Sequence, residues 1–270
     1  PDAGRYLLDD ELGYRPNPAH PDFHPTGCLA HSHVIERPEH CRRLLVLGDS
    51  VIERGHVGRA LAAELEPGWE VWSLGVSGYS TPEEVVLFER VVDSIQPDRV
   101  LLLFSYNDLS RTPLRFVDDT GRLVLVFAKG SLDLPASWIH RSALARLLLA
   151  LEARWDPMDE AEHRSRIRGA LERLQRVCSE HQIALSAAVQ PLIAPSLKLL
   201  RDPEHAELRT GAEARHERNL VMFADLAFPF VDLRATIVET LGAGLQPGEH
   251  AGDVHHPSPE LATRYAAQLA

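Results

Sequence analysis

The stretch that decides the fold reads Leu44-Leu45-Val46-Leu47-Gly48-Asp49-Ser50. Its four apolar residues predict a buried strand that ends at a small residue, an acid and a hydroxyl. Open α/β sheets bind their ligands outside the carboxyl ends of the strands, so Ser50 is a candidate nucleophile. Gly-Asp-Ser is also ordinary turn composition. The interpretation therefore depends on a base and an oxyanion site elsewhere in the chain.

Strand-like and helix-like segments alternate after residue 43. We expect strands at 44–47, 70–74, 100–104, 183–189 and 228–231, and helices at 57–65, 82–95, 142–155, 160–181, 213–225 and 259–269. Thr81 is the expected N-cap of the second helix, because Pro82 and two glutamates follow it. Strands that alternate with helices indicate an α/β fold, a doubly wound parallel sheet of about five strands.

The chain is predicted to form one domain over residues 44–270, because no Pro/Gly-rich linker divides it. Residues 1–43 have little periodicity and are expected to form an extended arm or loop packed on the core. Two insertions are expected, at about 110–141 and 190–212. The first should hold a β-hairpin, with strands at 115–117 and 123–127 around a turn at 118–121.

Composition excludes several classes of function. The chain has 270 residues and a formal net charge of −11, which argues against a nucleic-acid or anionic-membrane surface. No apolar stretch approaches the roughly 18 residues of a membrane span, so a soluble protein is expected. Three cysteines at unrelated spacings do not indicate a disulfide framework. The start at Pro1 is compatible with a cytoplasmic protein or with an exported one whose native N-terminus was removed; the oligomeric state stays open.

Three other strand ends carry residues that acyl transfer needs. They read Gly75-Val76-Ser77-Gly78, Ser105-Tyr106-Asn107-Asp108 and Asp253-Val254-His255-His256-Pro257. A serine needs a neutral imidazole to take its proton, and the imidazole needs a carboxylate to hold its tautomer. Oxyanion donors are available from the Ser50 and Gly78 backbone N–H groups and from the Asn107 amide. Asp253 is the candidate acid, and His255 and His256 are both candidate bases.

The ordered set Gly48-Asp49-Ser50, Gly78, Asn107-Asp108 and Asp253-x-x-His256 resembles the SGNH hydrolases, also called the GDSL esterase/lipase family. The matching motifs span residues 44–257, most of the chain, and the resemblance implies a flavodoxin-like sheet. It also implies roles by position: Ser50 as nucleophile, His256 as base, Asp253 as its orienting acid, and Ser50, Gly78 and Asn107 as the oxyanion hole.

Beside these residues we expect Asp49, Tyr106 and Asp108 to contact the substrate. The chain departs from the usual family pattern at Val51-Ile52-Glu53-Arg54-Gly55 and at Ser105, where many members have glycine. Neither departure removes a catalytic side chain. We expect them to bear on the class of substrate.

We expect a cofactor-independent serine esterase. Because the sequence shows no long hydrophobic helix pair like a lipase lid, the expected substrates are short-acyl esters, such as acetyl esters of a sugar or small metabolite. Two alternatives remain open: an acyltransferase with the same triad, and a non-catalytic carbohydrate-binding or scaffold protein. No metal or cofactor is predicted. The arm is rich in His and Cys, but its spacing fits none of the common zinc patterns. The expected partner is a small-molecule or glycan ester, with no nucleic acid.

Overall fold

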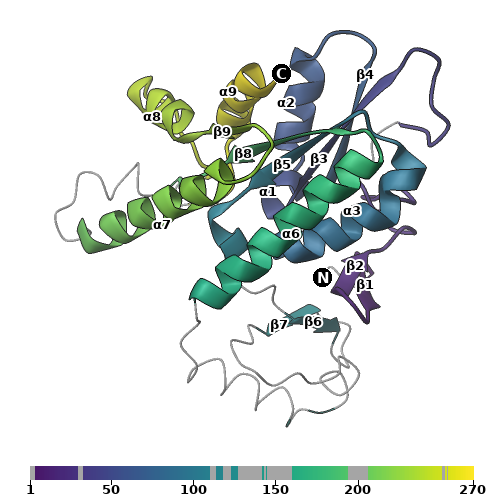
Figure 1. Ribbon diagram of the computed structural model, residues 1–270, viewed down its shortest axis with the longest axis horizontal. Helices are drawn as coiled ribbons and strands as arrows, with labels where there is room; N and C mark the ends of the chain where they lie inside the picture. Colours follow the sequence, from purple (N-terminus) through teal and green to yellow (C-terminus); the bar gives the residue numbers. More distant parts are fainter. Residues whose placement is uncertain are drawn as a thin grey trace.

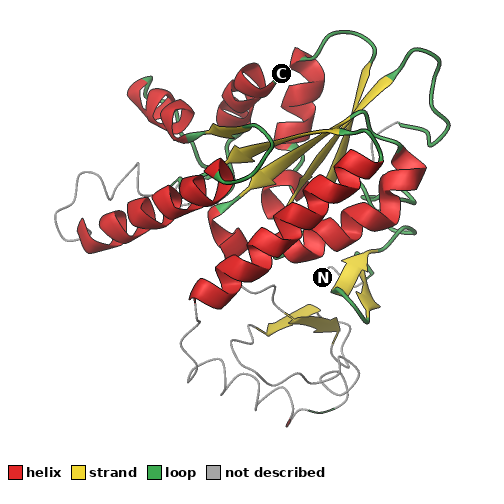
Figure 2. Cartoon of the chain, in the orientation of Figure 1, coloured by secondary structure: helices red, strands yellow, loops and turns green. Residues whose placement is uncertain are grey.

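The computed structural model describes residues 4–29, 33–109, 114–117, 123–126, 142, 144, 160–193, 206–250, 253 and 255–270. Its centre is a five-stranded parallel sheet covered by helices on both faces (Figure 1, Figure 2). The strands are β3 (Arg42–Gly48), β4 (Trp69–Gly75), β5 (Arg99–Phe104), β8 (Ala184–Val189) and β9 (Phe230–Asp232). Their order, β4-β3-β5-β8-β9, is that of a flavodoxin-like sheet and confirms the predicted fold class.

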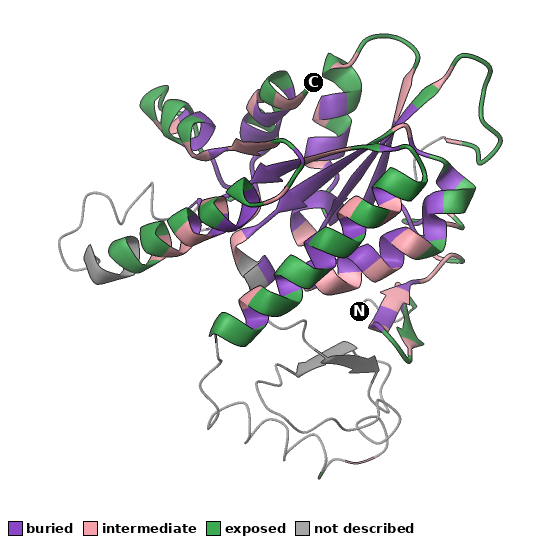
Figure 3. Cartoon of the chain, in the orientation of Figure 1, coloured by how far each residue is buried: buried purple, intermediate pink, exposed green. Residues whose placement is uncertain are grey.

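Two apolar clusters hold the helices on the sheet. One face carries α3 (Thr81–Ile95), α6 (Glu160–Glu180) and α7 (Ala206–Ala224). The opposite face carries α1 (Ser50–Glu53), α2 (His56–Glu64), α8 (Arg234–Gly242) and α9 (Pro259–Leu269). Side chains of β3 alternate between them, Leu45 and Leu47 toward α3 and Leu44 and Val46 toward α2. Burial on both faces explains the unbroken apolar run (Figure 3).

The N-terminal arm has more regular structure than the predicted loop. β1 (Tyr6–Asp9) and β2 (Gly13–Pro16) form an antiparallel hairpin. Tyr6, Tyr14 and Phe23 are buried and belong to the cluster on the α3 face. The arm therefore contributes core side chains. Its strands are too short to show periodicity in the sequence.

The predicted hairpin in the first insertion is confirmed as β6 (Leu114–Val117) paired antiparallel with β7 (Leu123–Val126). The turn expected at 118–121 and nearly all of the helix expected at 142–155 lie outside the described residues, as does much of the insertion at 190–212. Within the described ranges, no helix is long and apolar enough to cross a membrane.

One local prediction is wrong, and two short helices were missed. The N-cap of α3 is Ser80 and not Thr81, because Ser80 keeps an extended backbone (φ −118°, ψ 166°) while Thr81 is already helical. Ser80 Oγ donates to Glu83 Oε2 at 2.6 Å, which steadies the first turn. The two short helices α1 and α8 were not predicted, and α1 begins at Ser50 itself.

Candidate active site

Ser50 is the first residue of α1 and directly follows the tight turn that ends β3. The Asp49 carboxylate caps α1 by accepting the Val51 backbone N–H at 2.9 Å. The structure has no space for a Cβ atom at either of two glycines beside this turn. A Cβ on Gly48 would lie 2.7 Å from Ile52 Cγ1, and one on Gly75 would lie 2.8 Å from the Asp49 carbonyl oxygen. These two glycines therefore let β3, β4 and α1 meet closely at the carboxyl edge of the sheet.

In the predicted triad, His256 lies within hydrogen-bond distance of both Ser50 and Asp253. His256 Nε2 is 2.9 Å from Ser50 Oγ, and His256 Nδ1 is 3.0 Å from Asp253 Oδ2. When the Nδ1 proton is donated to Asp253, Nε2 is left free to accept the Ser50 hydroxyl proton. This arrangement suits a general base that acts on a serine.

Asp253 is buried and held as a carboxylate. Burial alone would raise the pKa of its carboxyl group, but the backbone N–H groups of His255 and His256 and the His256 ring outweigh this and lower the pKa below its usual range. The two N–H groups donate to Oδ1 at 3.0 and 3.1 Å. The acid thus stays charged at neutral pH and can stabilise a protonated His256.

The structure distinguishes His256 from His255, the two candidate bases that the sequence residues alone left open. His256 reaches Ser50, whereas His255 contributes its backbone carbonyl, which accepts the Gln190 Nε2–H at 2.7 Å. Burial, with a smaller effect from the neighbouring His256, lowers the pKa of His255. The histidine selected by the family spacing is therefore the one that contacts the serine.

The predicted oxyanion donors come from the ends of β3, β4 and β5. Among the residues that the structure describes, the backbone N–H groups of Ser50 and Gly78 meet no hydrogen-bond acceptor. Gly78 has a left-handed backbone with φ +82°, which favours glycine. Asn107 lies in the 3₁₀ helix η1 (Tyr106–Leu109), directly after β5; its side chain is outside the description.

Two of the three residues predicted to contact the substrate are buried and hold backbone N–H groups instead. Asp49 and Asp108 are completely buried: Asp49 caps α1, and Asp108 Oδ2 accepts the Ser105 backbone N–H. Short acids that satisfy turn N–H groups next to a strand end are easily mistaken for substrate ligands. Tyr106 is partly exposed, and the Arg215 guanidinium of α7 lies 4.6 Å from its ring centre.

A cluster of buried acids lies behind the turn. Glu84 of α3 is 1 % exposed, and neither of its carboxylate oxygens has a partner among the described residues. Burial, followed by the charges of Asp108 and Asp49, raises the pKa of Glu84 well above its usual value. Burial and Asp49 likewise raise the pKa of Asp108. A proton shared between Glu84 and Asp108 would supply the missing donor.

The described residues contain one group with the spacing of metal ligands: Glu249, Asp253 and His256, whose ligand atoms lie within 4.8 Å of one another. Two members of this group are the predicted acid and base. Glu249 also faces Arg54 Nε at 3.4 Å and His56 Nε2 at 3.5 Å. In the described part of the arm, no histidine or cysteine joins such a group.

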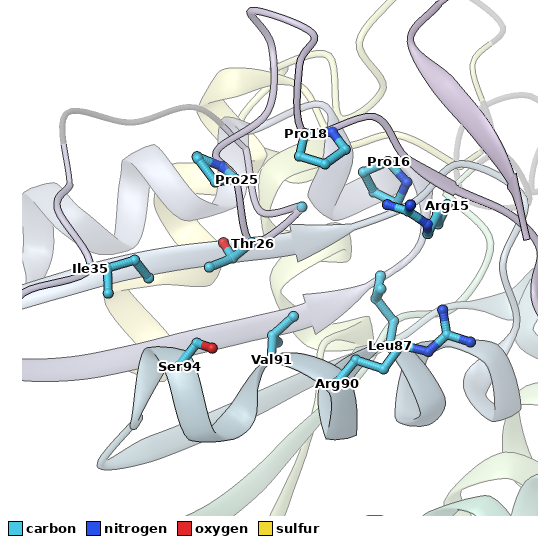
Figure 4. Close-up of a pocket in the computed structure, with 11 residues that line it drawn as sticks. Arg15, Pro16, Pro18, Pro25, Thr26, Ile35, Leu87, Arg90, Val91 and Ser94 are labelled. Carbon is cyan, nitrogen blue, oxygen red and sulfur yellow. The ribbon is translucent and has the colours of Figure 1, made fainter.

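A cavity of about 440 Å³ lies away from the triad, between the arm and α3 (Figure 4). Leu87 and Val91 of α3 face Pro16 and Pro25 of the arm across it. Arg90 at its edge already forms ion pairs with Asp9 and Glu11. None of the predicted site residues lines this cavity, so its size alone does not make it the active site.

Sequence reasoning missed three residues that support the site. Glu53 accepts hydrogen bonds from the loop that contains Gly78, Gln190 holds the His255 carbonyl, and Glu84 lies in the buried acid cluster. In the sequence, Glu53 stands out only as part of the departure from the family pattern after Ser50. In the sequence, Glu84 stands out only as one of the two glutamates at the start of a helix, and nothing marks Gln190, because polar residues in a loop or helix usually face solvent.

Comparisons with known proteins give structural matches only. No family model matches the sequence, and no curated protein matches it. The acetyl xylan esterase AlAXEase matches with a TM-score of 0.52 and 14% identity, over 84% of this chain and 97% of that chain. Axe2, an acetylxylan esterase from Geobacillus stearothermophilus, matches with a TM-score of 0.51 and 18% identity, over 84% and 92%. The chain therefore shares its fold with these two esterases.

Proposed function

We propose that the protein is a serine esterase that hydrolyses carboxylic esters through an acyl-enzyme on Ser50. The observation that carries this proposal is the continuous set of contacts from Ser50 Oγ to His256 Nε2 at 2.9 Å and from His256 Nδ1 to Asp253 Oδ2 at 3.0 Å. A binding protein has no need of a serine, a base and an acid aligned in this order.

In the proposed reaction, Ser50 Oγ bonds to the ester carbonyl carbon while His256 Nε2 takes the hydroxyl proton. The carbonyl oxygen becomes an oxyanion that the Ser50 and Gly78 N–H groups stabilise, with the Asn107 amide as a third donor suggested by the sequence. Collapse breaks the bond to the alcohol, which leaves with the proton from His256. Water then attacks the acyl carbon, gives its proton to His256 and releases the acid, and Ser50 regains its proton.

The proposed substrates are short-acyl esters, above all acetyl esters of a sugar or small metabolite. Two solved acetyl xylan esterases share the fold, which supports this class. Specificity is set by loops rather than by the fold. The acyl preference is therefore best measured directly, with p-nitrophenyl acetate, butyrate and octanoate and with an acetylated xylo-oligosaccharide.

The test compares the wild-type chain with Ser50→Ala and with Ser94→Ala, an exposed serine of α3. We expect p-nitrophenyl acetate hydrolysis and fluorophosphonate labelling in the wild type and Ser94→Ala but not in Ser50→Ala. Equal rates in all three proteins would refute the assignment. Acylated product formed when an acceptor alcohol is added would identify an acyltransferase. Folded protein that is neither labelled nor active would favour a non-catalytic role.

A further inference from the structure

The peptide group between Ser77 and Gly78 is held by side chains outside the triad. The Ser77 backbone N–H donates to Glu53 Oε2 at 2.6 Å, and Ser77 Oγ donates to the same oxygen. On its other side, the Ser77 carbonyl oxygen accepts the Tyr14 hydroxyl at 2.8 Å. All of the hydrogen-bonding groups of Ser77 are thereby fixed.

These contacts set the direction of the Gly78 N–H. The Ser77 carbonyl and the Gly78 N–H belong to one planar trans peptide, so they point in opposite directions. Fixing the carbonyl on Tyr14 therefore turns the N–H away from the arm. That N–H has no acceptor in the described part of the chain.

Glu53 joins the nucleophile turn, the Gly78 loop and the arm. It lies one helical turn after Ser50, and its side chain is 5% exposed. Its other oxygen, Oε1, accepts the Tyr6 hydroxyl and lies 3.0 Å from Arg5 Nη2. A buried carboxylate is costly unless it is paired and hydrogen-bonded, and here donors from two separate segments satisfy it.

Tyr14 is itself held in place. Its side chain is buried, its ring centre lies 4.9 Å from that of Tyr79 and 5.7 Å from that of Tyr6, and its carbonyl accepts the Tyr79 hydroxyl. Such packing leaves the hydroxyl one position, directly at Ser77. A rigid Tyr14 in turn holds the Ser77–Gly78 peptide in one orientation. An oxyanion donor that is oriented before the reaction begins stabilises developing charge most effectively.

We propose that Tyr14 and Glu53 are positioning residues that orient the Gly78 N–H toward the oxyanion, so that the N-terminal arm is a working part of the active site. This inference rests on the proposed esterase function of Ser50. Oxyanion donors act on charge that exists only in the transition state. Loss of either positioning residue should therefore lower kcat more than it changes KM.

The first experiment compares Tyr14→Phe with Tyr265→Phe in the full chain. Tyr265 is a matched control because it is equally buried but its hydroxyl has no partner among the described residues. Complete loss of one oxyanion donor costs about 10²- to 10³-fold in kcat, so a misdirected donor should cost about tenfold. We expect that loss in Tyr14→Phe with p-nitrophenyl acetate, with KM within about twofold, and no change in Tyr265→Phe.

A second readout isolates the oxyanion. A trifluoromethyl ketone adds to the nucleophilic serine to form a charged hemiketal, so its inhibition constant should rise in Tyr14→Phe by the same factor as kcat/KM falls. Glu53→Gln should behave in the same way. Glu70→Gln is the control and should leave both quantities unchanged. Glu70 lies on β4, the strand that ends at Gly75, and accepts the Arg43 Nε–H at 2.9 Å.

The possible failures can be told apart. A wild-type chain that neither turns over ester nor reacts with a fluorophosphonate would overturn the proposed function and this inference with it. An active wild type with unchanged kcat and inhibition constant in Tyr14→Phe would overturn the inference alone. An equal rise in KM and fall in kcat in Tyr14→Phe and Tyr265→Phe would also overturn it, because general loosening of the core would then explain the effect.

Discussion

Ser50 Oγ and His256 Nε2 lie 2.9 Å apart, although 206 positions separate the two residues in the sequence. Ser50 is fixed by the turn between β3 and α1. His256 is fixed by the loop before α9, where the Glu249 N–H donates to the His256 carbonyl at 2.9 Å and the Ser258 N–H donates to the Pro247 carbonyl at 2.7 Å. Each residue is therefore positioned by short local contacts, and the parallel sheet brings the two segments together.

The carboxylate of Asp253 is predicted to matter through its charge and through the histidine tautomer it enforces. Asp253→Asn keeps the shape of the side chain, but its amide N–H₂ cannot accept the Nδ1 proton. We expect kcat for p-nitrophenyl acetate to fall by about 10³- to 10⁴-fold. Asp225→Asn, a surface acid paired with Arg168, is the control and should keep full activity. A loss below tenfold in Asp253→Asn would show that Asp253 does not serve His256.

Buried Glu84 is predicted to make the protein less stable as the pH rises. Burial and the charges of Asp108 and Asp49 raise its folded-state pKa well above the usual value of 4.5. Above that pH the unfolded chain releases a proton that the folded chain retains, so the free energy of unfolding falls by up to about 1.4 kcal/mol per pH unit. The stabilisation that comes from protonated Glu84 is thus fully present at low pH and is lost as the pH rises through the folded-state pKa of Glu84.

Glu84→Gln should remove this dependence. Urea unfolding from pH 5 to pH 8 is expected to show the variant gaining stability relative to the wild type as the pH rises. Glu64→Gln, an exposed glutamate of α2, removes the same charge and should run parallel to the wild type. Curves for Glu84→Gln and the wild type that also run parallel would mean that Glu84 titrates normally.

The space between β4 and α1 is predicted to exclude even one methyl group. A Cβ on Gly75 would meet the Glu53 backbone nitrogen and lie 2.8 Å from the Asp49 carbonyl oxygen. Because neither backbone group can rotate away, Gly75→Ala should cost about 1–3 kcal/mol and displace Ser50. We expect a lower thermal midpoint together with a lower kcat.

Gly169→Ala provides the contrast. Gly169 is an α6 residue whose added Cβ would meet nothing within 4 Å, so alanine there should stabilise the helix by about 0.5–1 kcal/mol. If both alanine variants changed stability in the same direction, the steric argument for Gly75 would fail.

The parts of the fold that the sequence predicted are those with a local signal. The apolar run of β3 marks a strand buried on both faces, and Asp253 and His256 are close enough in sequence to hydrogen-bond within one loop. The five strands and most helices of the sheet domain have similarly clear periodicity. Their order then places the strand ends, and with them Ser50, at one edge.

The supporting contacts had no such signal. Tyr14 and Glu53 act through Ser77, and each of these contacts joins segments that are far apart in the sequence. Their partners depend on how the arm packs on the α3 face, and this packing follows from tertiary burial rather than from periodicity. Asp49 and Asp108 illustrate the converse error, because acids beside a nucleophile look like substrate ligands until their burial is known.

Gln190 is predicted to support catalysis without supporting stability. Its Nε2–H donates to the His255 carbonyl at 2.7 Å, whereas its buried Oε1 has no partner among the residues described. Gln190→Leu keeps the volume, removes the unpaired oxygen and frees the loop that carries His256. Because displacing a catalytic group by about 1 Å can cost about 10²-fold, we expect kcat to fall at least tenfold. The lost hydrogen bond to the His255 carbonyl and the removal of an unpaired buried oxygen affect stability in opposite directions, so the thermal midpoint should change little. Gln268→Leu, which removes an exposed glutamine that accepts the Thr236 hydroxyl, should leave kcat unchanged. Parallel loss of activity and stability in Gln190→Leu would show instead that Gln190 is an ordinary core residue.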